Sequence, residues 1–180
     1  MSDLFNRVTD DQNALQKLLA KIPGFKGYFE KQNRREADKI LRETVANRFE
    51  EQWKRISSVQ RDLISAGGLE HITELEGSAL KLRQFIDRIR RASYGYAGFF
   101  DAVKINEDEL SKVYTYDLSL FNMADDVGRA VDNIESSLET DGLPAAIRNL
   151  KTLSQQCLDA YNLRQETMIG GVAGTEGATQ

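Results

Sequence analysis

Apolar residues recur at alternating three- and four-residue spacings through the second half of the chain. This spacing keeps side chains on one face of an α-helix over many turns, which is typical of a helix packed in a bundle or coiled coil. Eight of the nine positions in the longest stripe are apolar, and an aspartate holds the ninth. The stripe consists of Leu110, Val113, Asp117, Leu120, Ala124, Val127, Val131, Ile134 and Leu138. It predicts a long helix over about 106–140.

Similar stripes elsewhere predict four further helices. They lie at about 10–21, 29–65, 69–92 and 144–168. Gly67 and Gly68 separate the second and third of them, as expected from the preference of glycine for helix C-caps. Pro144 stands at the start of the last helix, where proline is well tolerated. Helices joined by such short connections pack antiparallel.

The predicted fold is therefore an all-α antiparallel helical bundle, with about four long helices and a short N-terminal amphipathic helix. Residues 1–168 are expected to form a single domain. Residues 169–180 are rich in Gly, Ala and Thr, have no apolar face to bury, and are expected to be a disordered tail. An extended coiled-coil assembly is the alternative architecture, because broad apolar pairs such as Leu120 and Phe121 would suit a second helix.

Composition favours a cytoplasmic protein without a membrane span. The longest apolar runs are far shorter than the roughly 20 residues needed to cross a bilayer. Asp3, Asp10 and Asp11 interrupt the N-terminal segment, which therefore lacks the apolar core of a secretory signal. A single cysteine, Cys157, fits a reducing compartment and lies on the apolar face of its predicted helix, where we expect it to be a packing residue.

Charge is segregated along the chain, although the net charge is only −4. Basic residues exceed acidic ones by four in each of the segments 26–61 and 81–91, whereas acidic residues exceed basic ones by seven in 104–143. One interpretation is that the basic helices pack beside the acidic helix within one bundle and are held by flanking ion pairs. Pairing between chains is the alternative.

A second interpretation of the basic segments is an exposed face that binds anions, such as lipid headgroups or an acidic protein. The candidate residues for this face are Arg34, Arg35, Arg42, Arg88, Arg90 and Arg91. Nucleic acid is the poorest candidate ligand, because the sequence pI is about 5.2 and no recognition motif is present.

Two segments combine aromatic residues with glycines between predicted helices, and each is a candidate interaction loop. They contain Phe25 and Tyr28 in the first segment, and Tyr94, Tyr96, Phe99 and Phe100 in the second. Such aromatics either fill the end of a bundle core or form a binding surface, and the sequence leaves both interpretations open.

Asp117 occupies an inward position on the otherwise apolar stripe. A buried carboxylate is costly unless it is paired, so we expect an arginine from a neighbouring helix to meet it. A polar residue in this position could fix the register of the helices.

Residues with catalytic or metal-binding spacing are not evident in the sequence. The Glu-x-x-His pairs of di-iron bundles are missing, because His71 is the only histidine. The glycines of the two aromatic segments do not form a phosphate-binding loop, and no serine stands in a nucleophile elbow. We therefore expect no enzymatic activity, no metal or other cofactor and no small-molecule substrate.

Two segments near the start of the predicted bundle carry a resemblance. Residues 22–28, with the sequence IPGFKGY, and residues 34–39, with the sequence RREADK, resemble the opening of helical bacterial proteins of uncharacterised function. The resemblance implies a bacterial cytoplasmic protein and no particular activity. The short amphipathic start and long helical hairpin also resemble helical membrane-remodelling proteins in architecture.

The sequence thus leads to two expectations of function. The first is a structural or adaptor bundle that binds a protein partner or further copies of itself. The second is a peripheral membrane protein that inserts apolar residues of the N-terminal segment or the aromatic loops, while Arg34 and Arg35 contact anionic headgroups. The N-terminal residues in question are Leu4, Phe5 and Val8.

Overall fold

The computed structural model describes residues 14, 16–24, 34–92 and 107–176. Within them, four long helices form an all-α bundle. They are α2 (Arg34–Ser65), α3 (Ile72–Arg91), α5 (Glu107–Ser136) and α6 (Leu143–Glu176). A short 3-10 helix, η2 (Leu69–His71), leads into α3. The predicted all-α helical bundle is confirmed.

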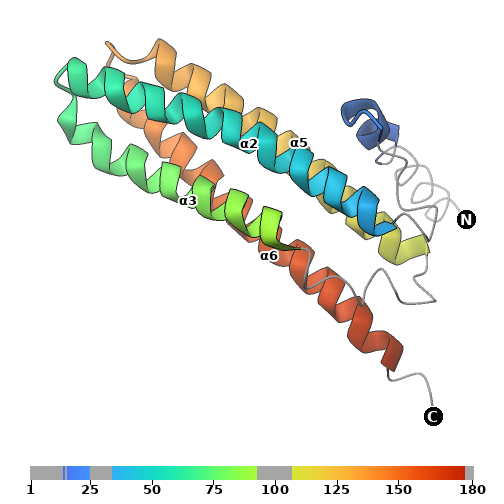
Figure 1. The fold of residues 1–180 in the computed structure, drawn as a ribbon. Helices are drawn as coiled ribbons and strands as arrows, with labels where there is room; N and C mark the ends of the chain where they lie inside the picture. The colour runs from blue at the N-terminus through green and yellow to red at the C-terminus, as the bar shows by residue number, and fades with distance from the viewer. Residues whose placement is uncertain (1–13, 15, 25–33, 93–106, 177–180) are drawn as a thin grey trace, which may run out of the picture.

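Two helical hairpins lie side by side in the bundle (Figure 1). One consists of α2 and α3, and the other consists of α5 and α6. Contacts join α2 to α3, α3 to α6, α6 to α5 and α5 to α2, so the helices follow that order around the bundle. Each hairpin is antiparallel, but the hairpins point the same way, and α2 therefore runs parallel to α5, as α3 does to α6.

The turn of the first hairpin is a Schellman motif. Gly67 adopts a φ of 82° and donates a hydrogen bond to the carbonyl of Ile64 (3.2 Å), while Gly68 donates to the carbonyl of Leu63 (2.9 Å). A positive φ is costly for residues with a Cβ, so the glycine fixes where α2 ends. The predicted end at residue 65 is confirmed.

The second hairpin differs from the prediction at two boundaries. Helix α5 ends at Ser136 rather than at residue 140, because the following residues form tight turns, in which Thr140 donates backbone and hydroxyl hydrogen bonds to the carbonyl of Ser137. Helix α6 continues past the predicted end at 168 to Glu176. Once a helix is nucleated, each added residue contributes another backbone hydrogen bond, so weak helix formers can prolong it.

One continuous hydrophobic core runs along the bundle. Near its centre, the rings of Phe49 and Phe85 lie 4.6 Å apart, and Tyr161 packs edge-on against Phe85 at 6.2 Å. The hydroxyl of Tyr161 donates a hydrogen bond to the carbonyl of Arg88 (3.3 Å). This contact connects the core to the last turn of α3.

The N-terminal segment packs its apolar face inward. Residues 16–21 are helical, and Leu18 and Ile22 are fully buried in the same core. The Lys21 ammonium pairs with Asp125 of α5 at 3.1 Å. The described part of this segment thus belongs to the bundle.

Candidate functional site

The predicted anion-binding face includes Arg42, and the structure corrects this assignment. The Arg42 side chain is only 4% exposed, and its Nε donates to the Asp38 carboxylate at 2.7 Å. Its Nη1 donates to the carbonyls of Ile89 and Arg90, each at 3.2 Å. Those carbonyls belong to the last turn of α3, which has no further helical N–H groups to pair with them. Arg42 therefore caps α3 from α2 and is not accessible to an external anion.

Two of the remaining arginines of the predicted face are also engaged within the chain. Arg90 pairs with the Glu50 carboxylate of α2 and donates to the Asn47 amide oxygen at 2.9 Å. Arg88 is exposed and donates to the Asn162 amide oxygen of α6 at 3.4 Å. These contacts hold both guanidinium groups against neighbouring helices.

Of the other three arginines, the structure describes the side chain of Arg91. Arg91 is exposed at the end of α3. Arg34 and Arg35 begin α2, but their side chains lie outside the described residues. The candidate aromatic loops lie outside them as well, so whether those aromatics are core or surface stays a prediction. They are Phe25, Tyr28, Tyr94, Tyr96, Phe99 and Phe100.

Glu50 anchors a polar cluster between α2 and α3. Besides Arg90, it faces the Arg83 guanidinium at 3.7 Å, and Arg83 in turn lies over the Trp53 ring at 5.4 Å from its centroid. The hydrogen bond from Arg90 holds the pKa of Glu50 below its ordinary value. The contacts of Glu50 with Arg83 and Arg90 tie α2 to α3.

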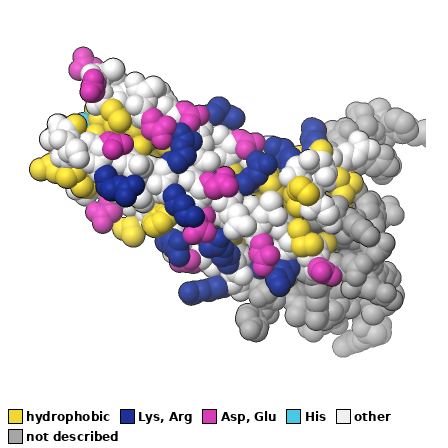
Figure 2. All heavy atoms as spheres, turned by 45° about the horizontal axis from the view of Figure 1, so that its top comes forward, with side chains coloured by type: hydrophobic (Ala, Val, Ile, Leu, Met, Phe, Trp, Pro, Cys, Tyr) yellow, Lys and Arg dark blue, Asp and Glu magenta, His cyan; other side chains and the backbone are white. Residues whose placement is uncertain are grey.

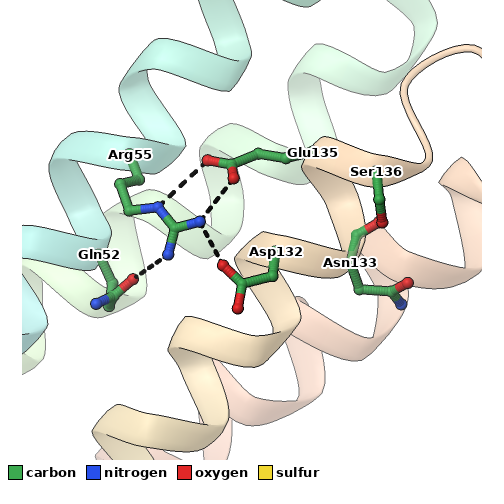
Figure 3. Close-up of polar contacts among 6 residues, drawn as sticks. All are labelled: Gln52, Arg55, Asp132, Asn133, Glu135 and Ser136. Carbon is green, nitrogen blue, oxygen red and sulfur yellow. Dashed lines mark hydrogen bonds and ion pairs between the residues drawn. The ribbon is translucent and has the colours of Figure 1, made fainter.

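Ion pairs also line the boundary between basic α2 and acidic α5. The Arg55 guanidinium donates to Asp132 at 2.5 Å, to Glu135 at 2.6 and 3.3 Å, and to the Gln52 amide oxygen at 3.0 Å (Figure 3). Hydrogen bonds to Glu135 and Asp132 raise the pKa of Arg55. The predicted pairing of basic and acidic helices inside one chain is thus present between α2 and α5.

A shallow pocket lies along the same boundary, with a volume of about 290 Å³. Its lining residues are Arg48, Glu51, Gln52, Ala124 and Asp125. Arg48 pairs with Asp125 at 3.1 Å and lies over the Phe121 ring at 5.3 Å from its centroid. Asp125 also binds Lys21, so Arg48 and Asp125 of this pocket each already have a charged partner within the chain.

Asp117 is fully buried, as predicted. Asp117 has an interaction partner. The proposed pairing with an arginine and the proposed role in register stay predictions.

Chemically reactive groups are sparse on the described surface. Cys157 is buried, and desolvation raises the pKa of its thiol to about 12, so it is not a nucleophile at neutral pH. Within the described ranges, no cluster of three or more His, Cys, Asp and Glu side chains could hold a metal ion. Nor is any helix there long and apolar enough to cross a membrane.

Exposed apolar side chains are the feature that the sequence stripes did not identify. Ile64 is 54% exposed and Leu69 is 64% exposed, both at the turn between α2 and α3, while Leu80 is 63% exposed on the outer face of α3. Ile64 and Leu80 fall between the inward positions of their stripes, and this off-stripe position is the signal that could have found them. Leu69 stands three residues before Ile72 and continues the stripe of its predicted helix, but it lies in η2, of which no residue is buried.

Comparison with protein-family models, with curated proteins and with solved structures finds no match for this chain. The class of protein is therefore defined by the fold alone, an all-α bundle of two helical hairpins.

Proposed function

We propose that this chain is a non-enzymatic structural or adaptor bundle that binds a protein partner. The observation that carries the proposal is the presence of large apolar side chains on the outside of a bundle that also has a continuous buried core. Ile64, Leu69 and Leu80 are each more than half exposed. Large exposed apolar side chains are favourable contact groups for another protein, because burying them removes apolar surface from water.

The contacts of the arginines also favour this function over a peripheral membrane protein. Arg42 is buried, and Arg90 is bound to Glu50. An anion that recruited Arg90 would have to replace that partner. In the N-terminal segment, Leu18 and Ile22 face the core and are not available to a bilayer. A bacterial origin and a cytoplasmic location accompany this proposal, as the resemblance of residues 22–28 and 34–39 implies.

Site-specific photo-crosslinking in the cells that produce the protein tests this proposal. A photoreactive amino acid replaces one exposed residue at a time, at Leu19, Leu69 or Leu80, and a matched variant carries it at exposed Thr152 of α6, among exposed polar side chains. We expect a protein adduct at one or more of the apolar positions and none at position 152. If none of the apolar positions gives a protein adduct, the proposed function is wrong.

A further inference from the structure

One end of the bundle combines exposed apolar residues with unbalanced charge. Residues 61–76 and 137–142 form this end, which we call the distal end. Figure 2 shows hydrophobic side chains on the surface at the end of the bundle farthest from the grey residues, with Asp and Glu side chains beside them. Ile64 and Leu69 are the large apolar side chains there that are more than half exposed.

The fold does not require apolar side chains at these two positions. The Schellman motif uses the backbone of Ile64 and the conformation of Gly67, so a polar side chain at position 64 would leave the turn intact. Leu69 lies in η2, of which no residue is buried. Their side chains therefore contribute little to the core, and each adds apolar surface that faces water.

Acidic residues outnumber basic ones at this end. The distal end contains six acidic residues and one basic residue, Arg61. The acidic residues are Asp62, Glu70, Glu74, Glu76, Glu139 and Asp141. Lys151 of α6 offsets one of them, through a 3.7 Å contact with Glu74, and His71 lies 3.7 Å from Glu70. Glu139 and Asp141 are exposed in the turn between α5 and α6.

We propose that the distal end docks a basic amphipathic segment of a protein partner, with apolar side chains covering Ile64 and Leu69 and with Lys or Arg beside the carboxylates. This inference rests on the proposed function and names the surface and the chemistry of its partner. An anionic membrane has the same sign of charge as this end and is repelled by it. A second copy meeting the same end would bring like charges together, because two-fold contacts juxtapose identical surfaces.

A peptide titration followed by methyl NMR tests the inference on the full chain. The probe is an 18-residue helical peptide with leucines on one face and lysines on the other. The control peptide keeps the leucines and replaces every lysine with glutamate. We expect the Leu/Lys peptide to shift the methyl signals of Ile64 and Leu69 while those of Leu80 stay in place. We expect the Leu/Glu peptide to shift none of them.

Matched variants separate docking at the distal end from general attraction to an acidic protein. The double variant Ile64→Ser/Leu69→Ser should weaken binding of the Leu/Lys peptide by about tenfold or more, and Leu80→Ser should leave the affinity unchanged. Because all three positions are exposed, circular dichroism should report an unchanged fold. Glu139→Gln/Asp141→Asn should also weaken binding, and should reduce its dependence on salt.

Several outcomes would overturn the inference. They are the absence of binding, equal binding of both peptides, shifts centred on Leu80, or full affinity in the Ile64→Ser/Leu69→Ser variant. Concentration-dependent self-association that this variant abolishes would assign the surface to a second copy, and flotation with anionic vesicles that it abolishes would assign the surface to lipid. Adducts at Leu19 or Leu80 alone in the crosslinking experiment would support the proposed function and would contradict docking at the distal end.

Discussion

Replacing Arg42 by methionine should destabilise the bundle far more than a surface substitution. Methionine keeps the apolar stem and removes the guanidinium. It removes the 2.7 Å ion pair with the Asp38 carboxylate and the hydrogen bonds to the carbonyls of Ile89 and Arg90, in a region where the Arg42 side chain is 4% exposed. Removing one partner of a buried ion pair costs about 3–5 kcal/mol. For a chain of this size, that free energy lowers the Tm by roughly 10 °C.

Urea unfolding, followed by circular dichroism and by the fluorescence of the single Trp53, measures this cost. Arg61→Met, an exposed substitution on the same helix, is the matched control and should stay within about 0.5 kcal/mol of the wild type. A double-mutant cycle with Asp38→Asn isolates the ion pair, and we expect a coupling free energy of about 1–3 kcal/mol. If Arg42→Met costs no more than Arg61→Met, the structural role of Arg42 is refuted and its place in an anion-binding face is open again.

Three further predictions concern a turn, a thiol and a surface carboxylate. Gly67→Ala should destabilise the folded state by about 1–2 kcal/mol, because Gly67 has a φ of 82°. Gly77→Ala should stabilise it by about 0.5–1 kcal/mol, because Gly77 lies within α3 with open space around it. Urea unfolding should show these opposite changes in the free energy of unfolding. Cys157, with its pKa raised to about 12, should react with a thiol reagent at pH 8 only when the protein unfolds, and rapid labelling of the folded chain would contradict its burial. The pKa of Glu50 is lowered in the folded state, so its contribution should be present above the unfolded value of about 4.5 and lost as the pH falls through the folded pKa. Glu50→Gln should therefore be less stable than the wild type at pH 7 and converge with it in acid, and a gap that does not change with pH would count against the Glu50–Arg90 pair.

Periodicity predicted the helices well because burial of one face is a local property of the sequence. The stripe of α5 correctly placed Val113, Asp117 and Val131 in the interior. The end of α2 was also predictable, since Gly67 is suited to the left-handed conformation that the cap requires. These features depend on neighbours within a few residues.

The contacts of Arg42 depend on a distant segment and could not be predicted in the same way. Asp38 stands four residues before it, which indicates a helical ion pair, but surface pairs with that spacing are common. Burial of the pair depends on where the end of α3 lies against α2. From the sequence alone, the buried Arg42 therefore cannot be distinguished from an exposed arginine.

The relative direction of the two hairpins is a second feature beyond local pattern. The charge segregation predicted that both basic helices pack beside the acidic helix α5. In the structure α2 adjoins α5, through Arg48 and Arg55, whereas α3 lies against α2 and α6, so the prediction is wrong for α3. The ends of α5 and α6 were also missed, because hydroxyl-bonded turns and the continuation of a helix leave little trace in apolar spacing.

Vesicle flotation of the full chain tests whether this bundle binds protein rather than lipid. The protein is mixed with phosphatidylglycerol-rich or neutral phosphatidylcholine vesicles at low and at physiological salt. We expect the protein to stay at the bottom of the gradient in all four conditions. Salt-sensitive flotation with the anionic vesicles alone, abolished by Arg34→Gln/Arg35→Gln, would show instead that the chain is a peripheral membrane protein.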